Sequence, residues 1–183
     1  MLAVTSRYRH VMATNPTTHD VRRHPSVVRV REALTDLGAT WGVVVLDEHA
    51  RTAASAAELL GVAVGQIANS HIFSVPDETD GEGRRPVLVL TSGAHRVDTS
   101  QVAVVLGVER LDRADADFVR RRTGFAIGGV PPVAHTHPVQ TLVDVTLAPY
   151  DVVWAAAGHP RTVFPTYYDE LLRITAGHPV EVD

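Results

Sequence analysis

The chain has 183 residues, 45% of them hydrophobic, which fits a single globular domain with an appendage. It contains no cysteine and no lysine, so disulfides, thiolate chemistry and any mechanism that needs a lysine are excluded. The formal net charge of -4 argues against broad coating of nucleic acid, although a local basic patch could still hold a few phosphates.

Residues 1–24 are predicted to be a flexible N-terminal tail. They are polar, contain Arg7 and Arg9, and have no acidic residue before Asp20, so a transit peptide is the alternative interpretation. The tail lacks the continuous apolar core of a signal peptide, and no apolar run in the chain approaches the roughly 20 residues that span a bilayer. We therefore expect a cytoplasmic protein that binds no membrane.

The first half of the folded region alternates helix and strand patterns. Apolar residues recur at helical spacing from Val27 to Leu37, before a helix-ending Gly38. Thr52 can cap the next helix and Gly61 can end it. In chain order we expect a helix over 25–38, a strand over 40–47, a helix over 52–61, a helical turn and strand over 64–75, a hairpin tip over 78–85 and its return strand over 86–92.

The second half continues this alternation. Asp98 and Gln101 form a capping-box pattern before a helix that ends at Gly107, and Thr166 is the expected cap of the last helix. Between them we expect a helix over 114–122 and strands or strand fragments over 141–147, 151–158 and 162–164. Short hairpins among interleaved helices favour a mixed α/β sheet over a doubly wound one. We expect residues 25–183 to form one domain.

The segment GFAIGGVPPVAHTHP (124–138) combines glycines, prolines and two histidines. Ile127 is expected to be buried, while Gly128 and Gly129 let main-chain N–H groups face a ligand without interference from a Cβ atom. Such amides suit the carbonyl oxygen of an ester under attack, where negative charge develops. The alternative is a tight loop that binds nothing.

His135 and His137 would share one face of a strand, so they could be metal ligands. No HExxH, CxxC or carboxylate cluster supplies a third ligand, so we expect neither a metal nor a cofactor. The two imidazoles could instead donate hydrogen bonds in a pocket or act as a general acid–base pair, or they could be surface side chains.

Three further groups each allow two interpretations. In AAAGHPRT (155–162), Arg161 could hold a carboxylate or phosphate or pair with a surface acid. Arg120, Arg121 and Arg122 could meet nucleic-acid phosphates or form a solvated helix end. Asn69 and Ser70, at a helix-to-strand junction, could face a ligand or satisfy local backbone groups.

Six segments in this order and spacing resemble the YbaK/EbsC family of aminoacyl-tRNA deacylases, relatives of the editing domain of bacterial prolyl-tRNA synthetases. They are TAASAAELLGV, GQIANSHIF, PVLVLTSGAHRVD, VAVVLGVERL, TGFAIGGVPPVAH and VWAAAGHPRTVF, which together span about residues 40–175. The resemblance implies a mixed α/β domain whose central sheet is mostly antiparallel and barrel-like, surrounded by helices.

The resemblance also implies an activity: metal-independent hydrolysis of the ester that joins a wrong amino acid to the terminal adenosine of tRNA. The partners would be the aminoacyl-tRNA acceptor end and an aminoacyl-tRNA synthetase, with no DNA. The glycine pair at 128–129 would place backbone amides near the scissile carbonyl, and the segment matching 157–161 would form another pocket wall. We expect the two segments to converge on one cavity.

Two positions depart from the family pattern. A pocket lysine of the family is replaced by Asn69, and an aspartate of some members by Val163. Either this chain belongs to a different subgroup, or it is a non-catalytic paralogue that binds aminoacyl-tRNA or a small ligand. The expected site residues are Gly128, Gly129, Asn69 and His137 for catalysis; Ser70, Ile127, Val130, His135, Gly158, His159 and Arg161 for substrate binding; and Arg120, Arg121 and Arg122 for tRNA binding.

Overall fold

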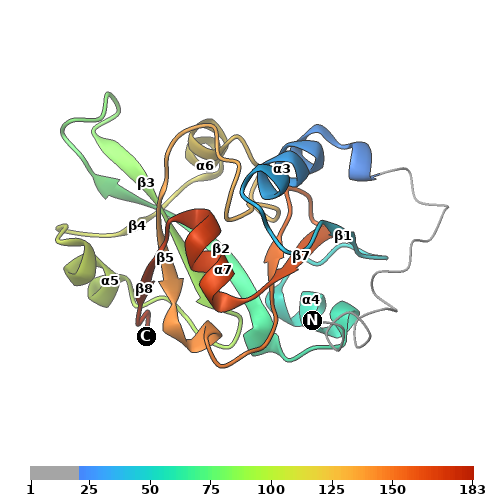
Figure 1. Cartoon of the computed structure of the whole chain (residues 1–183). Coiled ribbons are helices and arrows are strands. Elements are labelled where there is room, and N and C mark those ends of the chain that lie inside the picture. Colours follow the sequence, from blue (N-terminus) through green and yellow to red (C-terminus); the bar gives the residue numbers. More distant parts are fainter. Residues whose placement is uncertain (1–20) are drawn as a thin grey trace.

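A computed structural model describes residues 21–183 (Figure 1), so the predicted tail of residues 1–24 lies almost wholly outside the described residues. Its α-helices are α3 (Pro25–Asp36), α4 (Ala53–Leu60), α5 (Thr99–Leu106), α6 (Ala116–Thr123) and α7 (Tyr168–Thr175). Short 3-10 helices are η1 (Val21–Arg23), η2 (Val64–Gln66) and η3 (Val145–Leu147). The strands are β1 (Val44–Val45), β2 (Ile67–Pro76), β3 (Arg84–Ser92), β4 (Asp112–Arg113), β5 (Gln140–Asp144), β6 (Val153–Ala156), β7 (Thr162–Thr166) and β8 (His178–Val180).

All eight strands belong to one sheet in the order β1-β7-β6-β2-β3-β5-β8, with β4 paired to the far end of β2. The predicted mixed α/β class is confirmed. The prediction of a mostly antiparallel, barrel-like sheet is wrong. The pairs β2·β6, β3·β5 and β5·β8 are parallel, and β1 and β8 stand at opposite ends of an open sheet. Parallel pairing follows from the crossover through α5 and α6, which returns the chain to the edge of β3 in the same direction.

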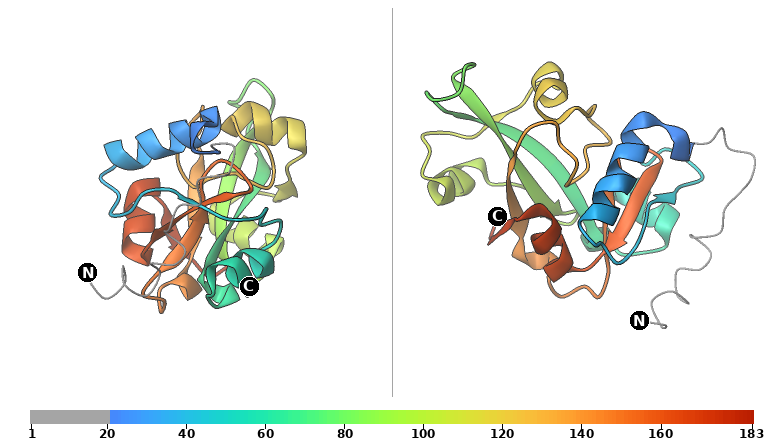
Figure 2. Two further views of the ribbon diagram at one scale, coloured as in Figure 1. Left: turned by 90° about the vertical axis from the view of Figure 1, so that its right-hand side faces the viewer. Right: turned by 45° about the horizontal axis from the view of Figure 1, so that its top comes forward.

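The sheet separates the core into two sides, as the alternation along β3 shows. Leu88 and Leu90 pack into the cluster that contains residues of α3, α6 and α7. Val87 and Val89 point the other way and pack with residues of α5, while α4 covers a separate cluster around Trp154. Figure 1 shows α3 and α6 at the top of the molecule and α4 and α5 at the bottom. Figure 2 shows the β2–β3 hairpin as a long twisted ribbon whose tip projects from the body.

The helix α4 has the ends that its sequence predicts. The Thr52 hydroxyl accepts a hydrogen bond from the Ser55 amide, which satisfies one of the free N–H groups of the first turn. Gly61 ends the helix in the left-handed conformation at φ 66°, where a side chain would be strained.

The predicted cap of α5 is only half correct. The Asp98 carboxylate accepts from the amides of Ser100 and Gln101, as expected. The return bond of a capping box is not formed, because the Asp98 amide donates to Val182 and the Gln101 side chain donates to Glu181.

The predicted cap of α7 is wrong. Thr166 is the last residue of β7, and its hydroxyl donates to the Glu170 carboxylate at 2.8 Å, while Tyr167 occupies the cap position. The strand predicted over 40–47 is reduced to β1, and the strand predicted over 141–147 divides into β5 and η3 where Asp144 caps the 3-10 turn. Within residues 21–183, no helix has the length and hydropathy to cross a membrane.

Candidate functional site

A cavity of about 530 Å³ opens beside β2. Five segments line it: the loop before α4 with the first turn of that helix, the first seven residues of β2, the stretch from β4 to α6 (Arg113, Ala114 and Val119), residues 127–130 of the glycine-rich loop, and the ends of β6 and β7 with the loop between them. Sites for small organic ligands usually measure about 300 to 1,000 Å³, so this volume suits an amino acid joined to a nucleoside.

The cavity lies where one edge of β2 has no partner strand. β3 pairs with the whole of β2 on one edge. On the other edge, β6 reaches only the first two residues of β2 and β4 reaches only residues 73–74, which leaves residues 69–72 unpaired. The Ile72 carbonyl accepts the Ala114 amide beside β4 at 3.4 Å. Alternate residues of a strand direct their main-chain groups to the same edge, so the amide and carbonyl of Ser70 face the gap.

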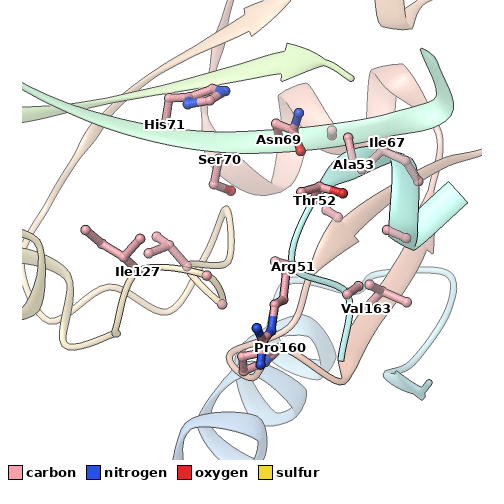
Figure 3. Close-up of a pocket in the computed structure, with 18 of the residues that line it drawn as sticks. Arg51, Thr52, Ala53, Ile67, Asn69, Ser70, His71, Ile127, Pro160 and Val163 are labelled. Carbon is pink, nitrogen blue, oxygen red and sulfur yellow. The ribbon is translucent and has the colours of Figure 1, made fainter. Parts of the chain in front are cut away.

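Side chains from both faces of β2 reach this gap (Figure 3). The Ser70 side chain points toward the glycine-rich loop and Ile127, and its buried hydroxyl has no hydrogen-bond partner among residues 21–183. His71 projects from the opposite face, and Asn69 shares that face because it is two residues away. Neither the side-chain carboxamide of Asn69 nor the His71 ring hydrogen-bonds to another residue of the described chain. The pKa of His71 is lowered, first by desolvation and then by the charge of Arg113.

The glycine-rich loop and the β6–β7 loop meet at the cavity, as expected. The Gly158 amide donates to the Gly129 carbonyl at 3.0 Å. A Cβ atom on Gly129 would lie 3.0–3.2 Å from main-chain atoms of Gly158 and His159, so a larger residue would require the two loops to move apart by a few tenths of an ångström. The two wall segments are therefore held together by their main chains.

Of the two glycine amides, that of Gly128 is the one free to act on a ligand. The Gly129 amide donates to the Ala126 carbonyl at 3.3 Å, whereas the Gly128 amide has no acceptor among residues 21–183. Gly128 has a φ of 93°, which other residues rarely adopt, and a Cβ atom there would meet nothing within 4 Å. Gly128 therefore borders open space.

Ile127 was expected to be buried, and this prediction is wrong. Its side chain is 61% exposed and stands at the mouth of the cavity across from His71 (Figure 3). Val130, three residues further along the same loop, is buried in the core and also lines the cavity.

His159 and Pro160 form the second wall, but Arg161 does not face the cavity. The Nε and Nη2 groups of Arg161 donate to the Leu46 carbonyl at 3.0 and 2.9 Å, which ties the loop before α4 to the β6–β7 loop. The Nδ1 atom of His159 accepts from the Arg161 amide. The pKa of His159 is lowered, first by desolvation and then by His24, His49 and Arg161.

Both histidines of the glycine-rich segment lie away from the cavity lining. The Nε2 atom of His135 contacts the Pro131 carbonyl at 2.8 Å and its ring packs edge-on against Phe125. Burial lowers the pKa of His135, while the hydrogen bond to Pro131 acts in the opposite sense. His137 is exposed beside the Thr136 hydroxyl.

The three arginines of α6 also lie outside the lining. Arg122 binds Asp80 and the Arg84 carbonyl, and Arg121 binds Glu82, so both hold the acidic hairpin tip against α6. Arg120 is exposed and forms no ion pair with the rest of the described chain.

Sequence reasoning missed five polar residues that line the cavity: Arg51, Thr52, His71, Arg113 and Thr162. The position of His71, two residues after Asn69, was a signal for a shared strand face. Thr52 was assigned only as a helix cap, and β4, which carries Arg113, was not predicted. Residues 21–183 contain no group of three or more His, Cys, Asp or Glu side chains arranged to hold a metal ion.

The sequence model of the aminoacyl-tRNA editing domain matches residues 47–174. The uncharacterized protein YwhH of Bacillus subtilis (strain 168) is 28% identical over 133 residues, which are 73% of this chain and 80% of YwhH. A proline–tRNA ligase of Limosilactobacillus fermentum is 35% identical over 95 residues, which are 52% of this chain and 16% of the ligase. A crystal structure provisionally described as a trans-editing enzyme for prolyl tRNA synthetase superposes with a TM-score of 0.78 at 39% identity, covering 87% of this chain and 97% of that one.

Proposed function

This chain belongs to the family of aminoacyl-tRNA editing domains, and we propose that it hydrolyses the ester between a wrongly attached amino acid and the 3′-terminal adenosine of tRNA. The observation that carries the proposal is a cavity sized for an aminoacyl nucleoside, lined by Gly128 and Ser70, whose amide and hydroxyl respectively have no hydrogen-bond partner within the described part of the chain. The proposal that it acts in trans draws support from the similar crystal structure, nearly all of which this chain covers.

In this mechanism, the ester carbonyl lies between β2 and the glycine-rich loop. Attack by water creates negative charge on the carbonyl oxygen, and the Gly128 amide donates to that oxygen. Because the loop is fixed by its bond to Gly158, the donor needs no rearrangement during the reaction. The aminoacyl side chain extends toward Ala53, Ala56 and Val163, which line the end of the cavity beside α4.

Polar groups of β2 orient the substrate. The Ser70 hydroxyl and main-chain carbonyl face the gap and can bind the attacking water or the α-amino group. Asn69 hydrogen-bonds the amino acid or ribose but adds no fixed positive charge to the site. The substrate preference of this protein therefore differs from that of relatives with a lysine at this position. The vicinal ribose hydroxyl assists the proton transfer. His135 and His137, the imidazoles that the sequence suggested for this role, lie outside the cavity lining.

A non-catalytic role in binding aminoacyl-tRNA is the second candidate. It is favoured by Asn69 and Val163, which leave the cavity lining without the lysine and aspartate that the family resemblance implies. Such a protein would hold charged tRNA without releasing the amino acid.

A panel of mischarged tRNAs, beginning with small hydroxylated and small apolar amino acids, separates the two candidates. We expect the wild-type protein to release the amino acid from at least one of them. The variant Gly128→Ala should be slower by about 100-fold, since a displaced oxyanion donor costs that much. Tight binding without release from any tRNA would establish the second candidate, and equal rates for the two proteins would remove Gly128 from the mechanism.

A further inference from the structure

The cavity is positively charged within an acidic chain. Its lining contains two arginines, two histidines and no carboxylate, although the whole chain has a net charge of -4. Arg51 and Arg113 form no ion pair or side-chain hydrogen bond with any residue of the described region. Unpaired positive charge in a concave site attracts anions, so the lining is suited to an anionic ligand.

Three histidine rings gather near the Arg51 side of this cavity, where His159 lines it and His24 and His49 contact the His159 ring without lining the cavity. The His159 ring lies 5.3 Å from that of His24 and 5.7 Å from that of His49, measured between centroids. The Nδ1 atoms of His24 and His159 accept backbone amides, so each neutral ring carries its proton on Nε2. These rings therefore have Nε2–H groups available as donors to an anion.

Arg51 lies next to this group of rings. The Ala50 amide donates to the Pro160 carbonyl at 2.9 Å, which brings the loop before α4 onto the His159 loop. Figure 3 shows the Arg51 side chain extending from that loop to Pro160. Asp47 and Glu48 precede His49 in the same loop; like His49 they do not line the cavity, and among the described residues neither forms an ion pair with Arg51. We call His24, His49, Arg51 and His159 the histidine rim.

The chemistry of the substrate identifies the anion. In an aminoacyl ester the carboxyl group of the amino acid is esterified, so the only anions that accompany the adenosine are the phosphodiesters of the RNA strand. Guanidinium and imidazole N–H groups are common donors to phosphate oxygens.

We propose that the histidine rim binds a phosphodiester of the RNA strand that ends in the aminoacylated adenosine. This inference rests on the proposed function, and it assigns tRNA recognition to residues other than Arg121 and Arg122, which are paired with the hairpin tip. The rim thereby positions the terminal ribose against β2.

Binding of the ribotrinucleotide CCA and of adenosine tests this proposal without requiring hydrolysis. We expect the wild-type protein to bind CCA more tightly than adenosine. Arg51→Gln and His49→Gln should each weaken CCA binding by about tenfold, the loss expected for one charge-assisted hydrogen bond, and leave adenosine binding unchanged. Arg51→Gln should also reduce the slope of log K against log salt by about 0.7.

Arg96→Gln is the matched control, because Arg96 is exposed and does not line the cavity, and it should bind CCA as the wild type does. Unchanged CCA binding in both rim variants, or an equal loss for CCA and adenosine, would overturn the proposal. If inorganic phosphate displaced CCA with an affinity similar to that of CCA itself, the rim would be a site for free phosphate instead. If the protein shows the expected CCA pattern but hydrolyses no mischarged tRNA, the phosphate site is supported and the proposed activity is refuted.

Discussion

At the level of single residues, Ser70 combines two properties that are unfavourable for a structural residue. Its hydroxyl is buried without a hydrogen-bond partner in the region that the structure describes, and its main-chain groups lie in the part of β2 that β6 and β4 leave unpaired. A buried polar group without a partner costs about 1 to 3 kcal/mol of stability. That cost is understandable if a substrate supplies the missing partner.

Ser70→Ala should therefore separate stability from activity. We expect the free energy of unfolding to stay equal or rise by about 1 kcal/mol, because the unsatisfied hydroxyl is removed. The rate of deacylation should fall by about tenfold if one substrate hydrogen bond is lost. Urea denaturation and single-turnover deacylation measure the two quantities. A destabilised variant with normal turnover would show that Ser70 has only a structural role.

The sequence identified several residues of the cavity but not their geometry. Gly128 and Gly129 line the cavity as predicted, whereas Gly158 faces α3 and is not part of the lining. All three were predictable as glycines, since close backbone approach or a positive φ favours this residue. His135 and His137 follow the same loop in sequence yet lie outside the lining, because Ala134 adopts a φ of 66° and the chain turns away. Arg51 and Arg113 carry no local pattern, and only tertiary contacts bring them to the cavity.

At the level of elements, hydrogen bonds between a helix end and its neighbours in sequence were predictable. Hydrogen bonds to distant residues, which compete for the same groups, were not. Thr52 and Gly61 end α4 as their types favour, because their partners lie within one turn. The Asp98 amide bonds to Val182 in place of the expected return bond from Gln101, and the Thr166 hydroxyl bonds to Glu170 of α7 in place of the expected cap bond. The strands β4 and β8 have two and three residues, too few for a period-two pattern.

One buried carboxylate joins α7, β7 and the segment that leads to β1. Glu170 of α7 is 1% exposed and accepts from the amide and hydroxyl of Thr40, at 2.8 and 2.7 Å, and from the Thr166 hydroxyl of β7. Arg173 lies 3.5 Å away. The contact fixes α7 against β7 and against the segment that leads to β1.

Glu170→Ala should lower the free energy of unfolding by about 3 kcal/mol, because three donors lose their buried acceptor. Glu170→Gln retains one acceptor oxygen, so we expect it to cost less. Urea denaturation of both variants measures these changes. If Glu170→Ala cost less than about 1 kcal/mol, the carboxylate would not be the contact that joins these elements.

At the level of the whole molecule, three histidines make stability depend on pH. The pKa values of His71, His135 and His159 are lowered in the folded chain, in each case chiefly by desolvation. In the unfolded chain these groups return to about 6.5. Between the two pKa values the unfolded chain binds more protons, so stability is lost as the pH falls through about 6.5.

The free energy of unfolding should therefore be lower at pH 5.5 than at pH 7.5. The lowered carboxylate pKa values of Asp77, Asp80 and Asp115 act at more acidic pH and do not enter this range. His135→Gln should reduce the difference, because one of the three groups no longer titrates. Equal stability at the two pH values would contradict the assigned desolvation.

Fold class was predictable from the order of helices and strands, but sheet order was not. The same string of elements fits an antiparallel barrel or an open mixed sheet, and only the crossovers between β3 and β5 and between β5 and β8 decide between them. The break in pairing along β2 depends on that arrangement, since β6 and β4 approach the same edge from its two ends. The site is thus a property of the whole sheet.

A structure of the complex with an amide-linked aminoacyl-adenosine analogue, which cannot be hydrolysed as an ester, tests the central claim most directly. We predict that the acyl carbonyl oxygen lies within about 3 Å of the Gly128 amide nitrogen, with the ribose against the unpaired residues of β2. An analogue that binds with its carbonyl away from the glycine-rich loop, or outside this cavity, would contradict the account.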